Sequence, residues 1–178
     1  MNHSMFRALA AVAFAAILSS CASDKKVDYC PGIASVLDAA IATQFKPGMA
    51  PDPANVLFTV QISDVKGKCI FDKQGKTSDS QLAITFQGTR AAPGPAVQYT
   101  VPYWVAVTQA TRVMTKDTRS VTIAFEAGAT TATAEEDVDS IKLVTDGDKK
   151  PYDYQTLVGL QLTKAQLDYN RTVGIFGQ

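Results

Sequence analysis

The chain has 178 residues, of which 46% are hydrophobic and 19% are charged, with 17 basic and 17 acidic side chains. This composition is typical of a globular protein, because disordered chains carry fewer apolar residues and more net charge. The length suits a single domain of ordinary size. A net charge of zero argues against a dedicated nucleic-acid-binding protein, which would carry an excess of basic side chains.

Residues 1–20 are typical of a secretory signal peptide. Arg7 supplies the positive charge near the start, and the apolar stretch of eleven residues that follows covers residues 8–18. Signal peptides carry an apolar stretch of about 7–15 residues, whereas a helix that crosses a bilayer needs about 20. We therefore expect this segment to be removed on export.

The end of the apolar stretch is the most specific motif in the chain. Leu18-Ser19-Ser20-Cys21 resembles the lipobox of bacterial lipoproteins, which has an aliphatic residue, two small residues and a cysteine. The resemblance implies cleavage before Cys21, acylation of its thiol, and stable attachment to a membrane through two or more acyl chains. Ala22, in a position where aspartate is an inner-membrane retention signal, implies the outer membrane, and we expect the domain on its periplasmic face. The alternative is an ordinary secreted protein whose Cys21 pairs elsewhere.

The remaining two cysteines are predicted to form a structural disulfide. Acylation of Cys21 would leave Cys30 and Cys69, and an oxidising compartment favours a bond between them. A redox pair or a metal site fits less well, because the spacing is not Cys-x-x-Cys and two thiolates without histidine bind metal poorly. We expect residues 21–29 to form a lipidated tether and residues 30–178 to form one β-sandwich domain.

The body of the chain alternates apolar and polar residues with a period of two, which is typical of half-buried strands. Residues 33–45 are ambiguous, since their alanines favour a helix, but we expect a strand there beside the first hairpin. Thr163 followed by Gln166 indicates a helix N-terminus with a capping box, and the helix should end near Asn170. The clearest alternating runs are 56–62, 82–86, 97–107, 121–125, 141–143 and 158–162. Turn residues are expected to separate them at 66–68, 91–95, 126–128 and 146–151.

This pattern resembles an antiparallel immunoglobulin-like sandwich, here followed by a short C-terminal helix. The cysteine–tryptophan–cysteine order of antibody domains is absent, because Trp104 follows both cysteines. The body is also similar to small uncharacterised envelope lipoproteins of proteobacteria, with its Cys30-Pro31 start and the sequence VGLQLT at 158–163. That similarity implies a location and no activity.

Catalytic motifs are scarce. The single histidine, His3, lies in the predicted signal peptide, so histidine-dependent triads and histidine-ligated zinc are not expected in the mature chain. An acidic cluster with Asp146 and Asp148 suggests Ca²⁺ binding, but the EF-hand spacing is absent and a solvated acidic loop is the preferred interpretation. A pair of glycosidase carboxylates far apart in the sequence is a remaining alternative. The cluster consists of Glu135, Glu136, Asp137 and Asp139.

Aromatic residues are the best candidates for ligand or partner binding. Alternation along 99–107 places Trp104 on the face opposite to Tyr103, where an outward tryptophan suits a protein partner or a sugar ring. A loop packed over Trp104 is the structural alternative. Pro102 lacks a backbone donor, which suggests an edge strand or a bulge and hence strand addition by a partner.

These observations predict a non-enzymatic envelope lipoprotein, anchored by Cys21, that serves as an assembly or binding module with an envelope protein partner. A glycan-binding or other ligand-binding module that uses Trp104 is the alternative, and a carboxylate-dependent hydrolase is a weaker one. We expect no cofactor, no metal and no nucleic-acid partner.

Overall fold

A computed structural model describes residues 29–174 of the chain. The predicted signal peptide, Cys21 and residues 21–28 of the tether lie outside the described residues. One α-helix, α1 (Lys164–Val173), and three single-turn helices, η1 (Leu37–Ala39), η2 (Pro53–Asn55) and η3 (Pro151–Asp153), accompany the strands. The strands are β1 (Gly32–Ser35), β2 (Ile41–Phe45), β3 (Val56–Phe71), β4 (Thr77–Thr89), β5 (Val97–Gln109), β6 (Arg112–Phe125), β7 (Thr131–Val144) and β8 (Gln155–Leu160).

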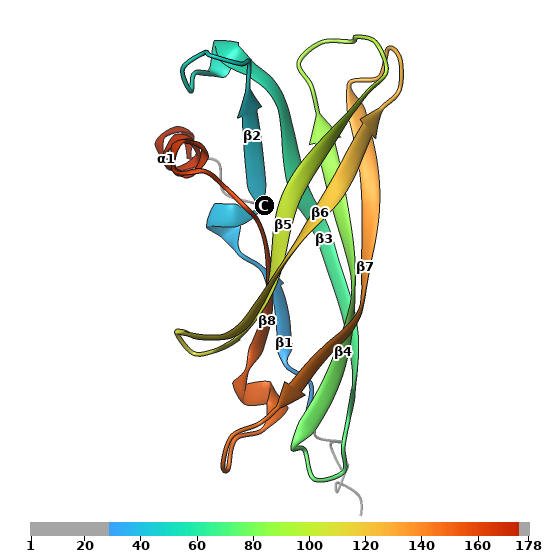
Figure 1. Cartoon of the computed structure of the whole chain (residues 1–178), viewed down its shortest axis with the longest axis vertical. Helices are drawn as coiled ribbons and strands as arrows, with labels where there is room; N and C mark the ends of the chain where they lie inside the picture. The colour runs from blue at the N-terminus through green and yellow to red at the C-terminus, as the bar shows by residue number, and fades with distance from the viewer. Residues whose placement is uncertain (1–28, 175–178) are drawn as a thin grey trace, which may run out of the picture.

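The strands form two four-stranded sheets. One sheet, sheet A, has the order β1-β8-β5-β6, and the other, sheet B, has the order β2-β3-β4-β7. All paired neighbours are antiparallel except β1 and β8, which run parallel. Figure 1 shows long, twisted strands in two layers with α1 beside β2. The predicted all-β, antiparallel sandwich with a short C-terminal helix is confirmed.

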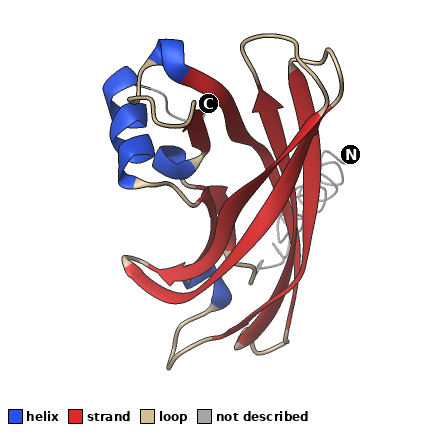
Figure 2. Ribbon diagram, turned by 45° about the horizontal axis from the view of Figure 1, so that its top comes forward, coloured by secondary structure: helices blue, strands red, loops and turns tan. Residues whose placement is uncertain are grey.

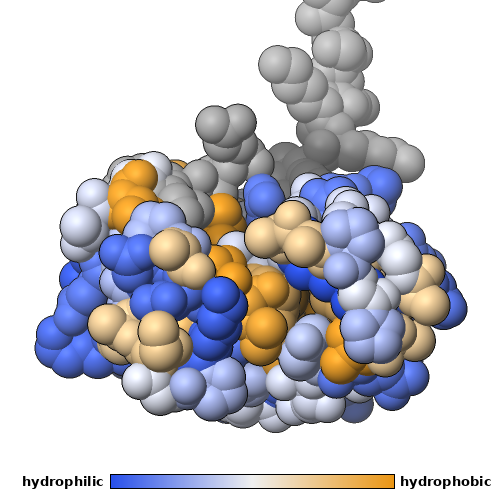
Figure 3. Space-filling model, turned by 90° about the horizontal axis from the view of Figure 1, so that it is seen from above, coloured by the Kyte–Doolittle hydropathy of each residue, from blue (hydrophilic) through white to orange (hydrophobic). Residues whose placement is uncertain are grey.

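The core lies between the sheets and follows the alternation seen in the sequence. Alternate residues of the central strands point inward, as Ile84 and Phe86 do from β4 and as Tyr103 and Val105 do from β5. Figure 3 shows the end of the molecule at which β3 and β5 begin, where a band of hydrophobic surface lies between hydrophilic sides. The largest fully buried side chains are Tyr103, Tyr154, Phe86, Phe125, Ile84, Ile123 and Leu160.

Helix α1 covers the outer edge of β2, which is an edge strand of sheet B. Gln166 Nε2 donates to the carbonyl oxygen of Thr43 at 2.9 Å, and Asn170 Nδ2 donates to that of Ile41 at 2.8 Å. Figures 1 and 2 both place the helix alongside this strand. Two carbonyl groups that point away from β3 are therefore paired with side-chain amides of the helix, and a further strand cannot add there while α1 is in place.

The predicted turn at 66–68 is wrong, because β3 continues through these residues to Phe71. Gly67 faces inward, and a Cβ built on it would lie 2.2 Å from Ile33 Cδ1 and 2.9 Å from Leu82 Cδ2. The glycine therefore allows neighbouring side chains to pack against the backbone of a strand, which is a recognised role of glycine in strands. The hairpin turn follows later, where Asp72 Oδ1 accepts a 2.7 Å hydrogen bond from the backbone nitrogen of Lys76.

The ambiguous segment 33–45 forms two short strands instead of one. Residues 32–35 pair with β8, η1 crosses from sheet A to sheet B, and residues 41–45 pair with β3. One of the alanines that favour a helix, Ala39, therefore lies in the single helical turn η1. The C-terminal helix begins at the predicted Thr163 cap and continues to Val173, three residues beyond the predicted end.

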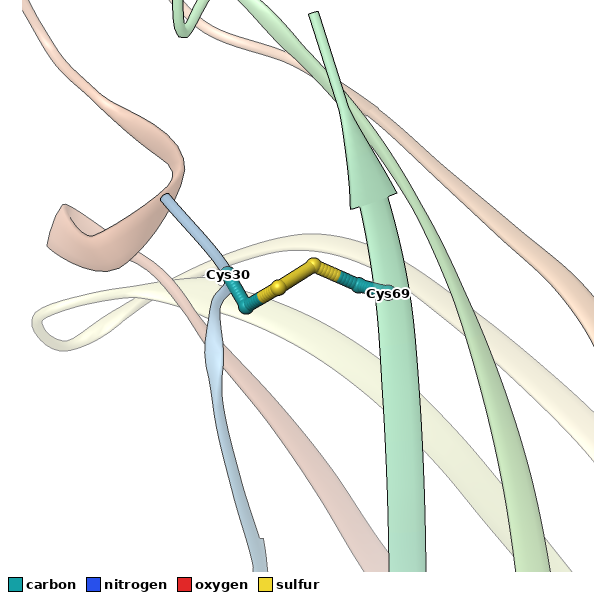
Figure 4. Close-up of a disulfide and its surroundings, with 2 residues drawn as sticks. All are labelled: Cys30 and Cys69. Carbon is teal, nitrogen blue, oxygen red and sulfur yellow. A yellow bond between two sulfur atoms is a disulfide. The ribbon is translucent and has the colours of Figure 1, made fainter. Parts of the chain in front are cut away.

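The predicted disulfide between Cys30 and Cys69 is present, with a Cα–Cα distance of 5.9 Å. Figure 4 shows the two side chains meeting between the segment that precedes β1 and strand β3. The bond closes a sequence separation of 39 residues. It ties the beginning of the domain, which belongs to sheet A, to sheet B.

Candidate binding surface around Trp104

Trp104 lies on the outer face of sheet A, as the alternation predicts. Its neighbours across the sheet are Thr118 on β6 and Gly159 on β8. The adjacent residues Tyr103 and Val105 are buried in the core. Trp104 itself is half-buried, so its surroundings decide what the ring can contact.

The indole ring packs directly against Gly159. A Cβ built on this glycine would lie 2.4 Å from Trp104 Cζ2 and 3.0 Å from the Cβ of Ala39 in η1. The Nε1 atom of Trp104 donates a 3.2 Å hydrogen bond to the carbonyl oxygen of Leu160. The single polar atom of the ring is therefore satisfied within the protein, and the ring joins β5 to β8 beside η1.

A lysine from the neighbouring strand covers part of the same ring. Lys116 Nζ lies 4.9 Å from the Trp104 ring centroid, within the range of a cation–π contact. The same ammonium group donates a 3.3 Å hydrogen bond to Gln161 Oε1. A sugar ring that approached this face of the indole would have to displace Lys116. The geometry therefore favours a packing role for Trp104 over a free stacking platform.

Pro102 is exposed on the same face of β5 as Trp104, at the point where strand β8 ends. β8 pairs with residues 103–108 of β5, and the last backbone contact is the hydrogen bond from the Gln161 nitrogen to the Pro102 oxygen at 2.9 Å. In a strand the nitrogen and oxygen of one residue point to the same side, so the missing donor of Pro102 faces the end of β8. Residues 97–101 of β5 pair with β6 alone, so only this half of the strand is an edge. Pro102 removes no hydrogen bond with β6, because its nitrogen faces the other side.

The acidic cluster lies in a strand, and the prediction of a solvated loop is wrong. Glu135, Asp137 and Asp139 are exposed residues of β7, the second edge strand of sheet B. No group of three or more histidine, cysteine, aspartate or glutamate side chains in residues 29–174 is arranged to hold a metal ion. Charged side chains on an edge strand discourage the addition of another strand, which is a structural reason for this cluster.

The sequence did not reveal an open hollow of about 390 Å³ on sheet B. Lys66 and Lys68 line it from β3, and Asp137 and Asp139 line it from β7. Ala83 lies between them on β4, because Lys66, Ala83 and Asp137 are neighbours across the sheet. Only the strand register brings these residues together, so no local signal in the sequence could have found the hollow.

Within residues 29–174, the two carboxyl groups with a clearly shifted pKa, those of Asp64 and Asp72, both have it lowered. A hydrogen bond from Lys66 lowers the pKa of Asp64, and the same 2.9 Å ion pair raises the pKa of Lys66. A hydrogen bond from the Lys76 backbone nitrogen lowers the pKa of Asp72. A general acid at neutral pH needs a carboxyl group with a raised pKa, which is the opposite direction. The raised pKa of Tyr103 reflects burial of its side chain in the core.

Comparison with family models, with curated proteins and with solved structures found no match to this chain. Within residues 29–174, no helix is both long and apolar enough to cross a membrane. Of the residues singled out in the sequence, the structure brings together Cys30 with Cys69, and Trp104 with Pro102 on one face of β5. The two pairs lie on different parts of the sandwich and form no common site.

Proposed function

We propose that this chain is a lipid-anchored module of the bacterial cell envelope that binds or helps to assemble other envelope components without catalysing a reaction. The observation that carries the proposal is the bond between Cys30 and Cys69. The sequence contains three cysteines, so this bond leaves Cys21, within its lipobox-like motif, as the third. A disulfide is also expected of an exported protein, because cytosolic thiols are kept reduced.

The position of the disulfide suits a short tether. Cys30 lies nine residues after Cys21, and Tyr29 begins the described domain eight residues after it. Eight residues span at most about 29 Å when fully extended. Acyl chains on Cys21 would therefore hold Tyr29 within that distance of a bilayer. Ala22 supports the outer membrane, and we place the domain on its periplasmic face.

A partner is proposed from the composition and from the absence of catalytic features in the described part of the chain. The balanced charge of the sequence speaks against nucleic acid and suits a protein or lipid partner. The two sheets offer large outer faces on β3, β4 and β7 and on β5 and β6. We place the module among accessory components of envelope assemblies, with an envelope protein as its partner.

Metabolic labelling with an alkyne analogue of palmitate tests the anchor. The full chain, expressed in a Gram-negative bacterium, should incorporate the label and sediment with membranes. Cys21→Ser should lose the label, because the acylated thiol is absent. The double variant Cys30→Ala/Cys69→Ala is the matched control, since it removes two cysteines and should keep the label. An unlabelled wild-type protein, or a Cys21→Ser variant that keeps the label, would contradict the proposal.

A further inference from the structure

Exposed hydrophobic side chains gather at the end of the sandwich at which the described chain begins. We define this tether end by Tyr29, Ile70, Phe71, Val144 and Tyr152. Ile70 is 79% exposed, Val144 70% and Tyr152 51%. Four of the eight large hydrophobic side chains that residues 29–174 leave exposed lie here. Figure 1 shows the start of the described chain, the β3–β4 turn and the turn after β7 at the same lower end.

The aromatic members of the tether end form a packed cluster. Tyr29 meets Phe71 edge-on, with ring centroids 5.3 Å apart, and stacks on Tyr152 at 6.0 Å. Gly75 in the β3–β4 turn has a φ of +62°, and a Cβ built on it would lie 2.8 Å from Tyr29 Cδ1. The turn therefore lies against the Tyr29 ring, and the cluster presents a preformed apolar surface.

Several polar groups of the two turns beside this cluster bond to one another. Asp72 accepts hydrogen bonds from the backbone of Lys76 and from Thr77 Oγ1, and Asp153 accepts one from the backbone of Lys150. Lys150 Nζ donates to the carbonyl oxygen of Gln74 at 2.6 Å, and Lys76 Nζ donates to that of Gly147. Turns whose polar groups are already paired lose less free energy when they leave water.

We propose that the tether end is a surface that rests on the phospholipid bilayer. This inference depends on the proposed acylation of Cys21, because Tyr29 is only eight residues further along the chain and then stays within about 29 Å of the lipid. Tyrosine rings with aliphatic neighbours and lysines are the side chains that favour the boundary between headgroups and acyl chains. The other large hydrophobic side chains that residues 29–174 leave exposed do not belong to this group; they are Leu37, Met49, Val113 and Val173.

Hydrophobic contact, and not net charge, is expected to dominate the interaction. The turns 72–76 and 146–153 contain four lysines and four aspartates, so their formal charge is zero. A surface held mainly by polybasic attraction would lose affinity as salt is added. The tether end should therefore contact zwitterionic and anionic lipids alike, with little dependence on salt.

Photo-crosslinking of the lipidated full chain tests the contact. The protein is reconstituted in vesicles of phosphatidylethanolamine and phosphatidylglycerol that contain a phospholipid with a diazirine in its acyl chain. Mass spectrometry should find the crosslinked lipid on peptides that contain Ile70, Val144 and Tyr152. Met49, which is 53% exposed beside η2, is the matched control site and should remain unlabelled. Labels spread evenly over the domain, or concentrated at Met49, would overturn the inference.

A pair of variants separates this inference from the proposed anchor. Ile70→Ser/Val144→Ser changes two exposed side chains and should reduce lipid crosslinking several-fold, whereas Met49→Ser should leave it unchanged. Both variants should still carry the palmitate label, because Cys21 is unchanged. A wild-type protein without that label would count against the proposed acylation and would not test the tether end. Retained label with undiminished crosslinking in the double variant would refute the tether end as the contact.

Discussion

At the scale of single residues, position 159 determines where the only tryptophan of the chain lies. The indole ring occupies the space in which any other residue would place its Cβ, and its Nε1–Leu160 hydrogen bond holds it there. A hydrogen-bonded aromatic ring has less freedom to move aside than an aliphatic side chain. A glycine is therefore needed at position 159 for Trp104 to pack on the outer face of sheet A. The alternation of the sequence does not distinguish this position from any other in the strand.

Gly159→Ala should lower the free energy of unfolding by about 1–3 kcal/mol, because the added methyl group must displace the ring. The emission of Trp104 should shift to longer wavelength as the ring leaves its half-buried place. Gly32→Ala is the matched control, since a Cβ there meets only Gln155 Cγ at 3.9 Å. Denaturant unfolding followed by fluorescence measures both effects. Equal stability of the two variants would contradict the packing role of Trp104.

Period-two alternation predicted parts of β3, β4, β5, β6 and β8, because one face of each is buried in the core, but it missed the acidic first half of β7. The sequence predicts a turn at Gly67, because a glycine in a turn and a glycine in a strand against which side chains pack have the same local signal. The neighbours that decide the matter, Ile33 and Leu82, are distant in the sequence. The same reasoning applies to the tether end, whose members Tyr29 and Tyr152 are brought together only by the fold.

At the scale of elements, the spacing of α1 matches the strand it covers. Gln166 and Asn170 are four residues apart on the helix, a rise of about 6 Å. The carbonyl groups of Thr43 and Ile41 are two residues apart on β2, a rise of about 6.6 Å. One face of the helix can therefore bond to successive outward carbonyls of the strand, and the two elements run antiparallel.

Asn170→Ala tests this protection of the strand edge. Asn170 is buried, and its removal leaves the Ile41 oxygen without its donor, so we expect a loss of about 1–3 kcal/mol in stability. Loosening of the helix should also expose the β2 edge and promote self-association. Thermal unfolding and light scattering measure the two effects, with Lys164→Ala on the exposed face as the control. An Asn170→Ala protein as stable and monomeric as that control would contradict the assignment.

At the scale of the whole molecule, the disulfide connects the two sheets at one end. Loop closure over 39 residues should contribute roughly 3–4 kcal/mol through the entropy of the unfolded chain. Cys30→Ala/Cys69→Ala should unfold at correspondingly lower denaturant concentration, and the wild-type protein with reductant should behave like the variant. A double variant with unchanged stability would show that the bond contributes little beyond the packing around it.

The position of the same bond also decides how the molecule bears mechanical force. Strand β1 is four residues long and lies at the edge of sheet A, so a pull on residue 29 alone would be resisted only by its short pairing with β8. Cys30 instead passes the load to Cys69 on β3, which pairs with β4 along residues 59–71. A force on the residues that precede Tyr29 is thus carried by one of the longest strands of the domain and by its extended pairing with β4.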